Sequence, residues 1–303
     1  MKITSFDDFC LWMYCQIDDA WKSMAHEFRR SGPEPTTCSD SEVLSLAILS
    51  ECCGWDIETE LQSRWQPHRH LFPSLPSQSR FNRRRRALQQ AFDRLRQWVV
   101  ARLDLAADRQ CILDSVPIPV VEFQHAPRAS RQWRVYGASF GKISAKQQTI
   151  YGYKLHLLLT VSGVLLDWSL TGAHERDLAA GEDLLQEHHN RVVLADKAYI
   201  SAPVADALQR QRGITLLTWP RKNQRQQLPR LLYKPFQDLR RRIETVNSQL
   251  REQFRLERNH ALSFFGLVTR IATKLAAHVL CVFLNRWLDQ PNCLSVKHLA
   301  FPI

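Results

Sequence analysis

The order of apolar segments after residue 109 is the feature that most constrains the fold of this chain. Three segments with strand character, 110–121, 152–161 and 163–171, follow one another with only turns between them. Two more, 191–200 and 213–220, each follow a segment with helical spacing. Strands joined by turns pair antiparallel, whereas strands reached through a helix run parallel. The sequence therefore predicts an α/β fold with a mixed five-stranded sheet.

A long helical segment completes this order. From Phe236, just past Pro235, to Phe254, apolar residues recur at helical spacing. The resulting order of three strands, helix, strand, helix, strand and helix is that of the RNase H-like fold. We therefore predict an RNase H-like domain with flanking helices over residues 106–303, which includes the C-terminal helices.

The first third of the chain has a different pattern. Residues 1–105 lack strand alternation and show helical spacing that is broken by Pro and Gly clusters. One segment begins at a residue able to cap a helix, Ser39 or Asp40, and stops near Gly54. We predict an all-helical domain over residues 1–105.

The charge balance favours a polyanionic partner. The chain has 41 Lys and Arg against 30 Asp and Glu, a net charge of +11, which is typical of proteins that bind nucleic acid. Four consecutive arginines precede a segment with helical spacing, and we predict that they contact DNA phosphates; a solvated helix face is the alternative. These residues are Arg83, Arg84, Arg85 and Arg86.

A second basic segment, residues 128–148, contains aromatic residues and two glycines. This composition suits a flexible loop laid along DNA, and a merely disordered loop is the alternative. The predicted DNA contacts in it are Arg131, Arg134, Lys142 and Lys146.

Membrane, secretory and zinc-binding proteins are disfavoured. The apolar segment 275–284 contains His278 and is far shorter than the roughly 20 residues of a membrane span, so we predict a buried helix. Two early aspartates, Asp7 and Asp8, interrupt any secretory signal. The eight cysteines form no CxxC pair and are expected to be free buried thiols. We therefore predict a cytoplasmic protein without a membrane partner.

Two apolar runs each lead into a carboxylate, at Asp114 and at Asp196. The carboxyl ends of buried strands are where α/β folds place their chemistry. If the two strands are neighbours, the two charges repel each other unless a proton or a cation lies between them. The sequence therefore predicts a divalent metal site.

A third ligand is expected on the long helix. Mg²⁺ prefers oxygen ligands, and Glu244 lies at the edge of the apolar stripe that contains Ile243 and Val246. Each carboxylate alone has another explanation: a turn cap for Asp114, an ion pair for Asp196, or a helix salt bridge for Glu244. Together they suit two metal ions and phosphodiester chemistry. We predict that all three are catalytic metal ligands.

Other polar residues receive no catalytic role. His156 and Asp167 are expected either in the core with satisfied partners or exposed by strand alternation, and Asp177 is expected to cap a helix.

Seven segments, in the order in which they occur, carry a family resemblance. They are "SDSEVLSLAIL", "LPSQSRFNRRRR", "ILDSVPIPV", "YGYKLHL", "LADKAYI", "RRRIETVNSQL" and "TRIATKLAAHVLCVFLN". The chain resembles the DDE transposases of bacterial insertion sequences, most of all the group numbered nine-eighty-two, in the RNase H-like and retroviral integrase superfamily. The resemblance implies that Asp114, Asp196 and Glu244 form the metal-binding triad and that the N-terminal helices bind the ends of the element.

The sequence departs from this family at two places. Ala198 stands where such transposases often have glycine, which affects only the turn after the strand. Arg240 and Arg251 only approximate the family's Tyr, Arg and Lys signature around the catalytic glutamate. We predict both arginines as DNA contacts, with a solvated helix face as the alternative.

The predicted function is that of a transposase. Two Mg²⁺ ions, with Mn²⁺ as a substitute, activate water to cut at the element's ends, and the freed 3'-hydroxyl then attacks target DNA. The partners are double-stranded DNA, as terminal inverted repeats and as target, and further copies of the chain, in the cytoplasm at the nucleoid. The alternatives are an RNase H-like nuclease without joining activity and an inactive, transposase-derived DNA-binding regulator.

Overall fold

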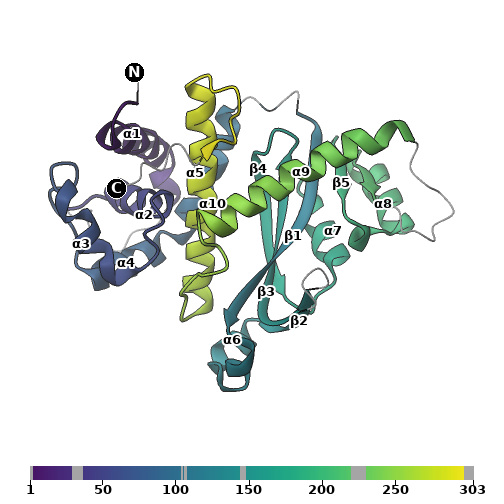
Figure 1. Ribbon diagram of the computed structural model, residues 1–303, viewed down its shortest axis with the longest axis horizontal. Coiled ribbons are helices and arrows are strands. Elements are labelled where there is room, and N and C mark those ends of the chain that lie inside the picture. Colours follow the sequence, from purple (N-terminus) through teal and green to yellow (C-terminus); the bar gives the residue numbers. More distant parts are fainter. Residues whose placement is uncertain are drawn as a thin grey trace. The chain divides into compact units, whose positions relative to one another are not determined.

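The computed structural model describes residues 3–28, 37–103, 105, 108–143, 148–219 and 230–296 (Figure 1). Contacts divide the chain into two compact units, a helical unit of residues 1–103 and 249–303 and a sheet unit of residues 104–248. The predicted division at residue 105 placed the C-terminal helices with the sheet. The contacts group them with the N-terminal helices instead.

The described part of the helical unit contains helices and connecting turns. Its α-helices are α1 (Phe6–Met24), α2 (Asp40–Cys52), α3 (Leu61–Trp65), α4 (Gln78–Ala87), α5 (Gln89–Arg102) and α10 (Phe264–Trp287), and its short 3-10 turns are η1 (Ala25–Glu27), η2 (Glu58–Glu60) and η3 (Gln66–His68). Helix α2 begins at the predicted cap, where Ser39 Oγ accepts from the Glu42 N–H and the Glu42 carboxylate accepts from the Ser39 N–H. This reciprocal pair satisfies two N–H groups that the helix leaves unbonded. The arginine run, expected just before a helix, itself lies in α4.

Helix α10 forms the centre of the helical unit, where it packs against α2 and α5. The buried helix predicted at residues 275–284 is part of this 24-residue helix. Within the described residues it is the one helix long and apolar enough to cross a membrane, but 89% of its most apolar window is buried in the structure. Burial on all sides is typical of a core helix in a folded domain.

The sheet unit contains the predicted series of strands and helices. Its strands are β1 (Gln110–Val121), β2 (Ser139–Ile143), β3 (Gln148–Thr160), β4 (Leu165–Gly172), β5 (Val192–Ala195) and β6 (Thr215–Thr218). Its helices and 3-10 turns are η4 (Phe123–Arg128), α6 (Arg131–Val135), α7 (Asp177–Leu185), η5 (Lys197–Tyr199), α8 (Ala202–Arg212) and the greater part of α9 (Arg230–Glu252). The last helix was expected from Phe236; within the described residues it begins at Arg230, and Pro235 lies inside it.

The strand order confirms the predicted topology. β3 pairs antiparallel with β1 on one edge, and on the other edge with β2 and then β4. β5 runs parallel to β1, and β6 runs parallel to β5. The order β4-β3-β1-β5-β6 is consistent with an RNase H-like fold. The sheet has six strands in the described residues rather than the predicted five, because residues 139–143 pair with β3 as β2.

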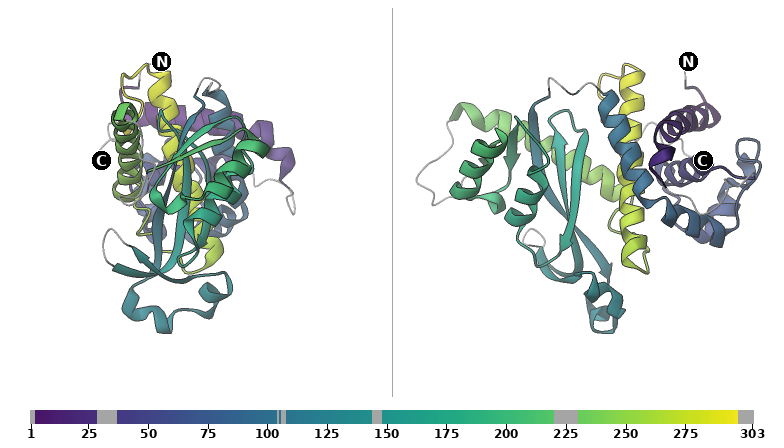
Figure 2. Two further views of the ribbon diagram at one scale, coloured as in Figure 1. Left: turned by 90° about the vertical axis from the view of Figure 1, so that its right-hand side faces the viewer. Right: turned by 180° about the vertical axis from the view of Figure 1, so that it is seen from behind.

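Helices cover both faces of this sheet. α7 and α8 lie on one face, and α9 crosses the other (Figures 1 and 2). α7 approaches the sheet closely at Gly181, where an added Cβ would lie 2.9 Å from Leu113 Cδ2 and 2.6 Å from the Tyr199 ring. Leu113 therefore points towards α7. Because side chains alternate along a strand, its neighbour Asp114 points to the opposite face, towards α9.

Candidate active site

Two parallel strands bring the predicted aspartates next to each other. β1 and β5 are in register up to the pair Leu113 and Ala195, so Asp114 and Asp196 are the next residues on adjacent strands. Neighbouring strands lie about 4.8 Å apart. The sequence argument for a metal site depended on these two strands being neighbours, and the pairing of β1 with β5 meets that condition.

Asp114 lies in a half-buried position inside β1. Burial raises the pKa of Asp114 to about 6, and the negative charges of Asp196 and Asp177 act in the same direction. Hydrogen bonds from the Ser115 N–H and from Asn247 Nδ2, the latter 2.9 Å from Asp114 Oδ2, oppose this rise in pKa. The ionised carboxylate is therefore costly until a proton or a cation lies beside it.

Asp196 is the first residue after β5 and is exposed. One of its oxygens, Oδ1, accepts a hydrogen bond of 2.6 Å from the Lys197 N–H, so that Asp196 caps the short turn η5. This bond holds the Asp196 carboxylate beside the Lys197 N–H and limits its rotation. Its second oxygen receives no backbone bond in the described structure, so it can serve as a ligand.

Glu244 lies on α9 with a side chain that is 59% exposed. Arg240 Nε donates a hydrogen bond of 2.9 Å to Glu244 Oε1, one helical turn away. This is the helix salt bridge that the sequence left open as an alternative explanation. An exposed pair of this kind contributes about 0.5 kcal/mol, so Glu244 is easily released from it.

The three carboxylates line one cavity of about 120 Å³ in the sheet unit. Asp114 and Asp196 lie at its sheet side, and Glu244 and Arg240 line it from α9. Trp219 and Phe236, whose ring centroids are 6.0 Å apart, also line it. Since a water molecule occupies about 30 Å³ in the liquid, the cavity has room for a hydrated cation rather than for a large ligand.

The donor atoms suit a hard divalent cation, because all three groups are carboxylates and a cation would relieve the repulsion felt by Asp114. In the conformation described here, no three His, Cys, Asp or Glu side chains of the described residues approach closely enough to hold a metal ion. For Glu244 to act as a third ligand, its side chain would have to leave Arg240.

Asn247 is a residue of this site that the sequence reasoning missed. It is 8% exposed and donates to Asp114 from the turn of α9 that follows Glu244. A signal for it was present, because Asn247 is a polar residue directly beside the apolar stripe residue Val246. Residues three apart on a helix share a face, so Glu244 and Asn247 both face the sheet.

The polar residues without a predicted catalytic role have partners of their own. His156 is fully buried and shares hydrogen bonds with Thr171 Oγ1, at 2.9 Å, and Tyr199 Oη, at 3.3 Å. Asp167 pairs with His188 at 3.1 Å. The predicted cap at Asp177 is wrong: the cap position is Arg176, without a side-chain bond, and Asp177 instead binds Lys154 Nζ at 2.8 Å.

His156 predicts a dependence of stability on pH. Burial lowers the pKa of His156 to about 4, whereas an unfolded histidine titrates near pH 6.5. The buried neutral His156 therefore contributes its full stabilisation above pH ~6.5, and this contribution is lost as pH falls towards 4. The loss in the free energy of unfolding is on the order of 3 kcal/mol. Urea unfolding at a series of pH values should show a smaller decrease for His156→Gln than for the exposed control His125→Gln. Equal decreases in both variants would contradict this assignment.

The basic segment 128–148 is folded in part. The expectation of a flexible loop is corrected for α6 and β2, because Trp133 is buried and β2 pairs with β3. The predicted DNA contacts Arg131, Arg134 and Lys142 are exposed on these elements. Lys146 lies outside the described residues.

The four arginines of α4 have two different environments. Arg84 binds Asp40 at 2.6 Å, and Arg85 is buried against Glu51, at 2.8 Å, and Glu58, at 3.4 Å. These two arginines are held inside their own unit, because helix periodicity turns them towards α2. Arg83 and Arg86 are exposed, and among the described residues neither forms an ion pair. Of the two predicted DNA contacts on α9, Arg240 is 70% exposed and binds Glu244, and Arg251 is exposed.

The comparison with protein families agrees with this arrangement. Residues 106–280 match the family described as transposase DDE domain. A search of curated proteins finds no match. The family match covers more than half of the chain and includes all three carboxylates that line the cavity. The chain therefore belongs to the DDE transposase family.

Proposed function

We propose that this protein is the transposase of a bacterial insertion sequence of the group numbered nine-eighty-two, which cuts DNA at the element's ends and joins the freed 3'-hydroxyl to target DNA. The observation that supports this proposal is that Asp114, Asp196 and Glu244 line one cavity between the sheet and α9, within the matched DDE domain.

Each residue of the cavity has a distinct role in this proposal. Asn247 holds one oxygen of Asp114, and the Lys197 N–H holds one oxygen of Asp196, so both carboxylates keep fixed orientations. Glu244 leaves Arg240 to complete the ligand set, and the freed guanidinium then neutralises a DNA phosphate. Trp219 and Phe236 exclude bulk water from the cavity. Bound divalent cations, Mg²⁺ or Mn²⁺, supply an activated water or 3'-hydroxyl and stabilise the leaving oxygen.

DNA binding in this proposal uses exposed cations on both units. Arg131, Arg134 and Lys142 serve in the sheet unit, and Arg83 and Arg86 serve in the helical unit. The substrate is double-stranded DNA, on which the protein acts as a homo-oligomer. Cleavage and joining take place in the cytoplasm at the nucleoid. The net charge of +11 supports a polyanionic substrate.

A strand-transfer assay tests the proposed function. Duplexes that carry the terminal inverted repeats flanking the gene are incubated with the protein and a target plasmid, with Mg²⁺ or with EDTA. We expect labelled 3' ends joined to the plasmid with Mg²⁺ only, and no protein covalently attached to DNA. Cleavage without joining would indicate a nuclease, and binding without cleavage would indicate a regulator; either result contradicts the proposal.

A further inference from the structure

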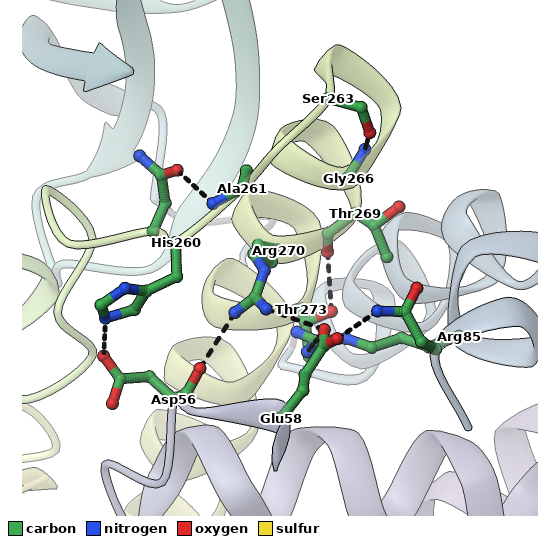
Figure 3. Close-up of polar contacts among 12 residues, drawn as sticks. Asp56, Glu58, Arg85, His260, Ala261, Ser263, Gly266, Thr269, Arg270 and Thr273 are labelled. Atoms are coloured by element: carbon green, nitrogen blue, oxygen red, sulfur yellow. Dashed lines mark hydrogen bonds and ion pairs between the residues drawn. The ribbon is translucent and has the colours of Figure 1, made fainter. Parts of the chain in front are cut away.

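The helical unit contains a second and larger cavity, of about 600 Å³. It is lined by the segment around Asp56 and Glu58, by the beginning of α4, and by the segment from His260 into α10 (Figure 3). Cavities of about 300–1,000 Å³ are typical of sites for small molecules or for parts of larger ligands. No carboxylate of the DDE site lines this cavity.

The charged side chains around this cavity are not balanced. Among the charged side chains that line the cavity, three are arginines and two are carboxylates; the arginines are Arg85, Arg86 and Arg270, and the carboxylates are Asp56 and Glu58. Glu58 lies 2.8 Å from Arg270 and 3.4 Å from Arg85, and thus serves two guanidinium groups (Figure 3). A lining with one more cation than carboxylates favours the binding of an anion.

One nitrogen of Arg85, Nε, has no hydrogen-bond acceptor in the described structure. The Arg85 side chain is only 5% exposed and lines the cavity. Burial and the neighbouring Arg85 also lower the pKa of Arg270, which is 8% exposed. An anion in the cavity would place a counter-charge beside Arg85 and Arg270, both of which line it.

The remaining lining adds positive charge at the open side. Arg86 lines the cavity and is exposed, and it has no ion-pair partner in the part of the chain that the structure describes. Two helices, α4 and the 24-residue α10, begin at the cavity, and neither has an acidic residue in its first turn. Helix N-termini carry partial positive charge and attract oxyanions.

We propose that this cavity binds a backbone phosphate of DNA, with Arg86 as the entry contact and Arg85 and Arg270 behind it. Guanidinium groups recognise phosphate oxygens through paired N–H donors. The volume exceeds that of a phosphate alone and leaves room for the attached sugar. The identity of the polymer rests on the proposed function, whereas the preference for an anion rests on the charges of the cavity itself.

The test compares Arg86→Ala with Arg69→Ala, an exposed arginine of the same unit that does not line the cavity. Binding of full-length protein to a labelled duplex is measured by fluorescence anisotropy in EDTA over a salt series. We expect Arg86→Ala to weaken binding about tenfold and to reduce the salt slope by about one, because one charge-assisted phosphate contact is lost. Arg86→Lys should retain most of the affinity, and Arg69→Ala should resemble the wild type.

A thermal unfolding measurement with inorganic phosphate distinguishes a DNA phosphate from a free phosphate compound as the bound anion. Phosphate should raise the unfolding temperature of wild type and Arg69→Ala, and should raise that of Arg86→Ala less. Stabilisation by phosphate with unchanged DNA binding in Arg86→Ala would assign the cavity to a free phosphate compound and overturn the DNA contact. Equal behaviour of Arg86→Ala and Arg69→Ala in both measurements would overturn the site altogether.

These outcomes are distinct from those of the strand-transfer assay, because binding is measured without metal. A protein that binds DNA through Arg86 but neither cuts nor joins it would contradict the proposed chemistry alone. A protein that cuts and joins DNA while Arg86→Ala binds like Arg69→Ala would contradict this inference and the DNA contact assigned to Arg86, but not the proposed chemistry.

Discussion

Asp196→Asn is expected to abolish DNA cleavage while DNA binding in EDTA remains unchanged. The asparagine keeps the size of the side chain and can still accept the Lys197 N–H bond, but it removes the charge that a divalent cation requires. Loss of several kcal/mol of charge stabilisation corresponds to a decrease in rate of about a thousandfold or more. The measurement is the rate of cleavage of a labelled element end with Mg²⁺.

The same assay with Asp114→Asn and Glu244→Gln tests the other two carboxylates. The control is Asp183→Asn, which removes an exposed carboxylate of α7 from the same unit and should cut normally. Without metal, Asp114→Asn should be at least as stable as the wild type, because a buried negative charge beside Asp196 is removed. Normal cleavage by Glu244→Gln would show that Glu244 is not the third ligand.

Glu51→Gln is expected to destabilise the helical unit by about 3–5 kcal/mol. Glu51 is 2% exposed and binds Lys274 at 2.5 Å and Arg85 at 2.8 Å. The charges of both cations outweigh burial, so the pKa of Glu51 is lowered. Removal of this carboxylate leaves two buried cations, Arg85 and Lys274, without their shared partner. Urea unfolding of the full chain at neutral pH measures the loss.

The matched control is Glu60→Gln in the same unit. Glu60 binds Arg64 at 3.0 Å, a length similar to that of the Glu51 pairs, but the side chains of Glu60 and Arg64 are 42% and 52% exposed. Water screens this pair, so its loss should cost less than about 1 kcal/mol. Similar losses of stability for Glu51→Gln and Glu60→Gln would refute the argument that burial makes the Glu51 cluster important.

Local sequence patterns were sufficient to predict most of the sheet unit. The run that ends at Asp196 is short, apolar and rich in β-branched residues, which is why a strand buried on both faces could be assigned there. The connections between segments then determined which strands are antiparallel and which are parallel. That order allowed Asp114 and Asp196 to be neighbours, and the pairing of β1 with β5 established that they are. β2 was not predicted, because its five residues alternate weakly and become a strand only by pairing with the edge of β3.

The sequence by itself determined the fold class, the position of each aspartate at a strand and the presence of Glu244 on the long helix, because these depend on periodicity and chain order, which are local properties. Only the tertiary structure decided which arginines of α4 are available. Arg83 and Arg85 look alike in sequence, but Arg85 meets Glu51 from α2, and Arg83 stays in solvent. Asn247 became part of the site for the same reason, through contact with β1. Ion pairs and hydrogen bonds between segments distant in sequence depend on which faces meet, and no local pattern contains that information.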